Sequence, residues 1–151
     1  MTAATLAFLH HAAAFLLVAI VLVELVLIRD GLTPGSARTL VRMDALYGLS
    51  ALVLLIVGFL RVFYTEKGPE YYFHSLPFLI KLGSFLAVGL LSIYPTVEFL
   101  RWRKALQASQ VPVVGASTLA RLKRLIHLEL VLLFVIMLCA ALMARGIGFI
   151  G

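Results

Sequence analysis

Four long apolar runs make up most of this chain, and each one contains or borders ionisable side chains. The runs cover residues 5–28, 44–63, 76–99 and 125–143. Each is close to or above the length of about 20 helical residues that a bilayer core requires. A hydrophobic fraction of 63% and a mean hydropathy of +1.09 agree with four membrane spans. We therefore predict an all-α polytopic membrane protein, built as a bundle of four transmembrane helices.

Four spans in 151 residues leave room only for short connectors, so we predict a single transmembrane domain over residues 1–151. A water-soluble four-helix bundle would need a polar stripe along each helix. Stretches such as 49–60 and 130–142 contain no such stripe. The first run carries charges at its far end and three more spans follow it, so we expect it to be retained rather than cleaved as a signal peptide.

Basic residues gather in the first and third connectors and their flanks, where nine lie, against three on the other side of the membrane. The nine are Arg29, Arg38, Arg42, Arg101, Arg103, Lys104, Arg121, Lys123 and Arg124, and the three are Arg61, Lys67 and Arg145. The positive-inside rule then predicts cytoplasmic connectors and both termini outside. The net charge of +6 is explained by this topology, and by attraction to anionic lipid headgroups, so we expect no nucleic-acid partner.

Within this topology, the ionisable side chains of the spans divide into two layers. A charged group at mid-bilayer costs about 2.5–3.5 kcal/mol on insertion scales, so such residues usually face a protein interior or a polar cavity. Fourteen residues separate His10 from Glu24, which places the layers about 21 Å apart by helix rise. The outer layer contains His10, His11, Arg61, Lys81 and Arg145, with His74 in the outer loop. The inner layer contains Glu24, Arg42, Asp44, Glu98, His127 and Glu129.

The outer layer is the place where we expect a binding site. His10, His11 and Lys81 lie at similar depths, so they can meet if the first and third spans are neighbours or diagonal partners. Such a pocket would suit an amphiphile with carboxylates, such as a porphyrin, whose propionates would meet Lys81 or Arg61. Alternatively, the histidines bridge neighbouring helices, Lys81 snorkels to the headgroups and Arg61 anchors its span at the interface. The residues expected to roof the site are Tyr64, Tyr71 and Tyr72.

A haem clamped between two histidines does not fit this arrangement. His10 or His11 would lie about 25 Å from His127 along the membrane normal, because they occupy opposite layers. A haem held by His10 or His11 alone, with Lys81 or water opposite, stays open as an alternative. Adjacent histidines on a helix point about 100° apart, so His10 and His11 make a poor pair of ligands and we predict no metal site.

In the inner layer, we expect His127 to pair with Glu24 or Asp44 near the cytoplasmic interface. Glu129 lies about 200° around the helix from His127, so we expect it on another face, where it snorkels to cytoplasmic water. On the second span, the small residues Gly48, Ala51 and Gly58 share a face with Asp44 and would allow close helix contact.

Five short strings of residues resemble the bacterial integral-membrane family catalogued as domain of unknown function 2214. They are RMDALYG at 42–48, GFLRVFY at 58–64, EKG at 66–68 followed by Tyr71 and Tyr72, KLG at 81–83 and SIYPT at 92–96. The resemblance covers nearly the whole chain and implies four spans in a bacterial inner (plasma) membrane. It implies no activity, because none is firmly assigned to that family.

A histidine early in the first span and a lysine early in the third also resemble the HemJ-type membrane protoporphyrinogen oxidases. In those enzymes the corresponding residues are needed for oxidation of the porphyrinogen, and haem b is bound. The resemblance would give these roles to His10 or His11 and to Lys81. The tryptophan-rich stretch expected after the histidine is missing, since residues 12–23 contain Phe15 as their only aromatic residue.

These observations lead to three hypotheses for the function. The first is a redox-related protein that binds a tetrapyrrole, with haem b as the candidate cofactor, and with no residue assigned a catalytic role. The second is transport of protons or small ions between the two layers, although the apolar middle at 53–57 and 130–136 argues against an open pore. The third is a non-catalytic membrane interaction protein. In each case we expect a homo-oligomer in the lipid bilayer.

The distribution of basic residues yields a prediction about orientation. A reporter that is active only outside the cytoplasm should be active when it is fused after Gly151, and silent when it is fused at Gln110, because the basic third connector stays inside. The reverse pattern of reporter activity would overturn the assignment of the two layers to the two sides of the membrane.

Overall fold

The computed structural model describes residues 2–29, 32–65, 67–108 and 110–150. Its elements are α1 (Thr2–Arg29), α2 (Pro34–Leu60), the π-helix η1 (Arg61–Thr65), α3 (Pro69–Phe73), α4 (Leu76–Gln107) and α5 (Ala116–Ala144). Four of the helices, α1, α2, α4 and α5, are long and apolar enough to cross a membrane. The prediction of an all-α, four-span membrane protein is therefore confirmed.

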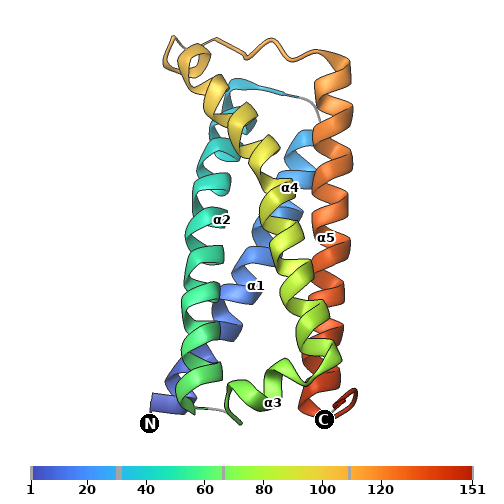
Figure 1. Cartoon of the computed structure of the whole chain (residues 1–151). Coiled ribbons are helices and arrows are strands. Elements are labelled where there is room, and N and C mark those ends of the chain that lie inside the picture. The colour runs from blue at the N-terminus through green and yellow to red at the C-terminus, as the bar shows by residue number, and fades with distance from the viewer. Residues whose placement is uncertain (1, 30–31, 66, 109, 151) are drawn as a thin grey trace.

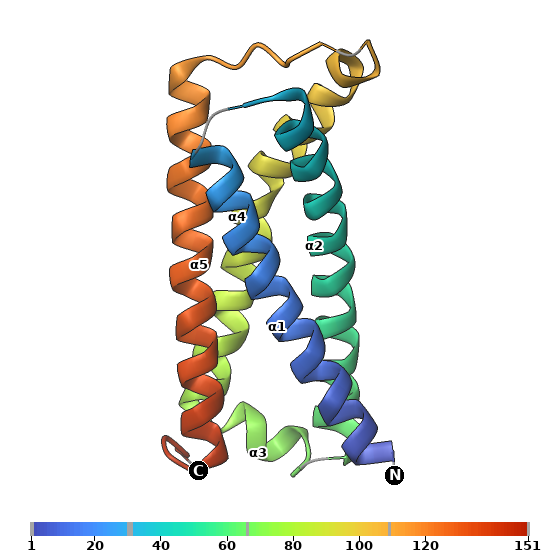
Figure 2. The same ribbon diagram turned by 180° about the vertical axis from the view of Figure 1, so that it is seen from behind.

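The four long helices form an elongated bundle in which α1 contacts α2 and α5, and α4 also contacts α2 and α5 (Figures 1 and 2). Among the described residues, the backbones of α1 and α4 do not approach each other closely, so these two helices are diagonal partners. Both ends of the chain and the short helix α3 lie at one end of the bundle, which we call the termini end (Figure 1). The α1–α2 and α4–α5 connectors lie at the opposite end, which we call the basic end.

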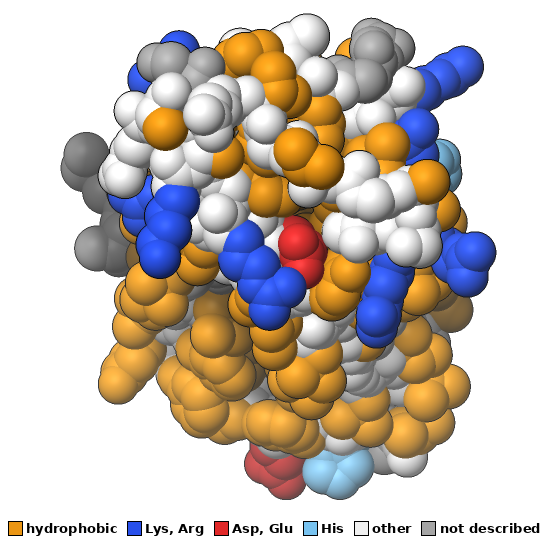
Figure 3. Space-filling view, turned by 90° about the horizontal axis from the view of Figure 1, so that it is seen from above, with side chains coloured by type: hydrophobic (Ala, Val, Ile, Leu, Met, Phe, Trp, Pro, Cys, Tyr) orange, Lys and Arg blue, Asp and Glu red, His pale blue; other side chains and the backbone are white. Residues whose placement is uncertain are grey.

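The basic end carries the nine Lys and Arg residues of the two connectors and their flanks. Figure 3 looks onto this end and shows these side chains spread around it. The α2 helix begins there with a reciprocal cap, in which Thr33 Oγ1 accepts from the Ser36 backbone N–H and the Ser36 hydroxyl accepts from the Thr33 backbone N–H. Because all nine residues share one end, the structure groups the charges as the topology prediction requires, while the orientation itself stays a prediction.

Side-chain packing differs between the two halves of the bundle. Toward the termini end, α1 diverges from α5, and α3 lies across the opening between them (Figures 1 and 2). In the basic half, the helices meet through fully buried side chains, and the Phe99 and Trp102 rings pack edge to face at 4.9 Å. The fully buried side chains of that half are Ile28, Ala37, Leu40, Phe99, Leu122 and Ile126.

The structure corrects the predicted orientation of α5. Glu129 is only 2% exposed and belongs to the buried face, whereas His127 is exposed and its Nδ1–H donates to the Lys123 carbonyl at 2.7 Å. The expected pairing of His127 with Glu24 or Asp44 is therefore wrong, and so is the expected snorkelling of Glu129. The reason lies in the spacing of three and four residues along the buried face. The buried residues of α5 are Leu122, Ile126, Glu129, Leu133, Ile136 and Cys139.

The segment after α5 folds back onto the start of α4. The Leu76 backbone N–H donates to the Gly148 carbonyl at 2.9 Å, and the Ile150 N–H donates to the His74 carbonyl at 2.8 Å. The Phe149 ring stacks on Tyr71 with a centroid distance of 4.9 Å. These contacts tie the segment after α5 to α3 and to the start of α4 at the termini end of the bundle.

Gly148 should be essential for this fold-back. Its φ of +84° is unfavourable for other residues, and a Cβ there would lie 2.7 Å from Pro77 Cδ. We expect Gly148→Ala to lower the free energy of unfolding in mild detergent by about 2–4 kcal/mol. A strained backbone and overpacking each typically cost about 1–3 kcal/mol.

Gly146→Ala is the matched control for this substitution. Gly146 also has a positive φ, of +69°, but a Cβ there would meet nothing within 4 Å. Gly146→Ala should therefore lower the free energy of unfolding only through the strained backbone, and so by less than Gly148→Ala does. Equal losses for the two variants would show that the contact with Pro77 does not matter.

Candidate functional site

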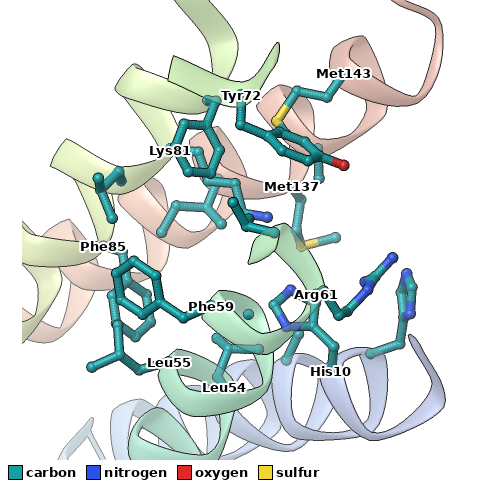
Figure 4. Close-up of a pocket in the computed structure, with 18 of the residues that line it drawn as sticks. His10, Leu54, Leu55, Phe59, Arg61, Tyr72, Lys81, Phe85, Met137 and Met143 are labelled. Carbon is teal, nitrogen blue, oxygen red and sulfur yellow. The ribbon is translucent and has the colours of Figure 1, made fainter. Parts of the chain in front are cut away.

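The termini half of the bundle contains a cavity of about 700 Å³ that is lined by all four spans, η1 and α3. Most of its wall is apolar, and Phe59 of α2 and Phe85 of α4 lie on it (Figure 4). The divergence of α1 from α5 makes room for the cavity, and α3 partly covers it. The bundle therefore combines a packed half with a half that has space for a ligand.

Four of the five span residues of the predicted outer layer lie on the wall of this one cavity, whereas Arg145 is exposed and is not among the described lining residues. His10 and His11 come from α1, Arg61 from η1 and Lys81 from α4. Figure 4 shows His10 and Lys81 approaching the cavity from different helices. The diagonal arrangement of α1 and α4 thus brings these side chains to one space, although the backbones of their helices do not approach each other closely.

His10 is held by a close contact with α2. A Cβ at Gly58 would lie 3.2 Å from His10 Cε1, so the absence of a side chain at position 58 leaves room for the imidazole. The ring lies near the backbone carbonyl of Leu54 and interacts electrostatically with Lys81 and Arg61. Its Nδ1 atom is buried and has no hydrogen-bond partner of good geometry among the described residues. His10 is therefore a positioned imidazole with unused hydrogen-bonding or ligating capacity.

His11 differs from His10 in both exposure and bonding. It is exposed, and its Nδ1–H donates to the Ala7 carbonyl at 2.6 Å, which leaves Nε2 as the basic nitrogen. The two imidazole rings lie 6.1 Å apart and at 86° to each other. The part of the chain that the structure describes contains no group of three His, Cys, Asp or Glu residues placed to hold a metal ion. Any iron bound here would thus take at most one of these two histidines.

Arg61 and Lys81 supply the cationic groups of the cavity. Lys81 is half-buried and lies on the cavity wall, which differs from the alternative in which it snorkels to the headgroups. Arg61 begins the π-helix η1 and is partly buried there. Single π-helical turns inside α-helices are frequent at functional sites. Together with Lys67, these residues make the cavity positive, because its described lining contains no Asp or Glu.

The roof of the cavity differs in part from the prediction. Tyr71 and Tyr72 line the cavity, but Tyr64 is 80% exposed and lies outside it. Tyr71 is fixed by stacking on Phe149 and by Lys67, whose Nζ lies 3.2 Å from its hydroxyl and 4.3 Å from its ring centroid. The π-helix rotates the side chains that follow Leu60 relative to those of α2, and this rotation could not be predicted from the sequence pattern.

The residues that α5 contributes to the cavity wall were not predicted from the sequence. Met137 and Met143 lie on its wall, beside the apolar residues of the same helix (Figure 4). Flexible thioether side chains adapt to irregular spaces and make favourable contacts with aromatic rings. The correct α5 register, set by its buried stripe, would have pointed Met143 to the bundle interior.

Three acids of the predicted inner layer form a second polar site, in the basic half, while His127 of that layer lies outside it. Glu24, Asp44 and Glu129 are 3%, 9% and 2% exposed, and the carboxyl groups interact electrostatically with one another. The Thr96 hydroxyl donates to Asp44 Oδ1 at 2.7 Å. The side chains that separate this site from the cavity are the buried apolar residues Leu17, Val21, Leu54, Val88 and Leu133.

No curated protein matches the chain, and no solved structure matches it either. A family model described as "Predicted membrane protein (DUF2214)" matches residues 2–148, which is nearly the whole chain and includes both polar sites. This protein therefore belongs to the DUF2214 family of predicted membrane proteins.

Proposed function

We propose that this membrane protein binds a tetrapyrrole through the cavity at the termini end. The observation that carries the proposal is an apolar cavity of about 700 Å³ with Arg61, Lys81 and His10 on its wall. Pockets for small molecules typically measure about 300–1,000 Å³ and combine apolar walls with a few polar groups. The cavity has the size and the lining of a site for a large amphiphile.

The chemistry of the lining favours a ligand with carboxylates. Apolar walls would accept the macrocycle, and the guanidinium of Arg61 and the ammonium of Lys81 would bind its propionates. The described lining contains no acidic side chain, so the charge of the cavity wall is positive. An anionic ligand would offset the cost of holding the Lys81 ammonium in an apolar site.

The lining also fits a tetrapyrrole that contains iron. The buried Nδ1 of His10 makes no hydrogen bond of good geometry among the described residues, so this imidazole could serve as one axial ligand. The perpendicular rings of His10 and His11 do not favour a pair of ligands on one iron. Haem b is thus a candidate cofactor, and the support for it comes from the cavity rather than from the HemJ-type resemblance.

The proposed location is the bacterial inner membrane, with the cavity on the outer side. Support for this orientation comes from the grouping of nine basic residues at the end opposite to the cavity. A ligand in the cavity would then exchange with the outer leaflet or with the space outside the cell.

Titration with haem and with iron-free protoporphyrin tests the proposal. We expect both to change their Soret absorption when they are added to the protein in mild detergent. Lys81→Met should weaken the binding of both ligands at least tenfold, about 1.4 kcal/mol, because both carry propionates. His10→Ala should weaken haem binding more than protoporphyrin binding, because only haem has an iron to ligate.

Two variants at the basic end serve as matched controls. Lys104→Met and His127→Ala remove the same side-chain types from exposed positions far from the cavity, so both should bind like the native protein. Identical titrations for the native protein, Lys81→Met and His10→Ala would remove the tetrapyrrole proposal.

A further inference from the structure

The buried carboxyl groups of the basic half are the second unusual feature of this bundle. They come from three helices, with Glu24 on α1, Asp44 on α2 and Glu129 on α5. The fourth helix, α4, contributes Thr96, which donates to Asp44. All four spans therefore converge on one polar site that lies about 21 Å from His10 along α1.

Within the part of the chain that the structure describes, no basic side chain balances these three acids. The described residues contain no Lys, Arg or His in an ion pair with Glu24, Asp44 or Glu129, and His127 is exposed on another face of α5. Carboxylates that share a site without a cation repel one another, and burial disfavours their charged forms further. Unpaired buried charges typically cost about 3–5 kcal/mol. Three ionised groups at this site are therefore incompatible with a stable bundle.

Three further polar atoms indicate that the site holds a ligand. The hydroxyl of Tyr47, a residue that is only 6% exposed, is buried near the Ser92 hydroxyl without a hydrogen bond of good geometry, and it interacts electrostatically with all three acids. Glu24 Oε1 and Glu129 Oε1 are likewise buried without partners among the described residues. Unsatisfied buried oxygens of this kind usually have a bound proton, water or ion.

The geometry favours protons over a metal ion. The three carboxyl groups do not form a group placed to hold a metal ion, in the part of the chain that the structure describes. Only Asp44 accepts a hydrogen bond from a described side chain, and Asp44 is also the most exposed of the three. Asp44 is therefore the best placed of the three acids to keep a negative charge.

We propose that Glu24, Asp44 and Glu129, together with Tyr47, form a proton-binding site. At neutral pH, Glu24 and Glu129 each carry a proton, and Asp44 retains the negative charge of the site with help from Thr96. The titratable groups that face the site are these three acids and Tyr47, while α4 presents the non-titrating hydroxyls of Ser92 and Thr96. Glu24 lies five residues from the end of α1, about 7.5 Å, so exchange with water would occur from the basic end.

Infrared spectroscopy of the native protein in phosphatidylcholine vesicles tests this proposal directly. At pH 7, the spectrum should contain the carbonyl band of protonated carboxylic acids, and the band should shift in D₂O as the protons exchange. Glu24→Gln and Glu129→Gln should each reduce its intensity by about half, since these two acids have buried oxygens without a hydrogen-bond donor, whereas Thr96 donates to Asp44. The absence of the band at pH 7, or a band that never shifts in D₂O, would overturn the proposal.

Glu98→Gln is the matched control, because Glu98 lies toward the same end of the bundle but pairs with Arg101 at 2.6 Å. This variant should leave the band unchanged. Addition of NaCl at constant pH, compared with choline chloride, separates protons from small cations. A band that persists in NaCl supports proton binding, whereas its loss in NaCl but not in choline chloride would assign the site to a metal cation instead.

Discussion

The structure depends on one constraint of the bilayer, which is that polar side chains within a span must face the interior of the bundle. Each helix must therefore bury its apolar contact stripe and its ionisable groups on the same face. In α5 this is achieved because Glu129 continues the spacing of Ile126 and Leu133, so one face serves both requirements. In α1 the same face carries His10 near one end and Glu24 near the other, with Leu17 and Val21 between them. The two polar sites are a direct consequence of that arrangement.

The two halves of the bundle differ in how closely their helices pack. In the basic half, short carboxyl side chains fit between closely packed helices, and large apolar residues such as Phe99 fill the remaining space. In the termini half, the imidazole of His10 occupies the space that a side chain at position 58 would need. There α1 contacts α2 through this pair, while α5 stays apart and α3 covers the opening. The cavity of about 700 Å³ lies in this less closely packed half.

Much of this architecture could be predicted from the sequence, because hydropathy and length define the spans. An even number of spans also places both chain termini at the same end of the bundle. The depth of His10 and Lys81 also follows from counting residues along helices. Rotation about a helix axis is harder to predict. The orientation of α5 was assigned from His127, one polar residue, whereas the whole buried stripe determines it and selects Glu129. Tyr64 was misplaced because η1 changes the register locally, and the small-residue face of α2 was right for Gly58 but not for Gly48, which is exposed.

The separation of the two sites explains why each needs a counter-charge of its own. At about 21 Å and an effective dielectric constant of about 20, a cation at the cavity and an anion at the inner site would attract each other by only about 0.8 kcal/mol. That is well below the several kcal/mol that it costs to bury one ion. The positive charge of Lys81 thus cannot be balanced by Glu24 or Glu129 across the apolar layer of Leu17 and its neighbours. An anionic amphiphile in the cavity and protons on the acids are the two separate means of neutralisation that we propose, and either one can hold without the other.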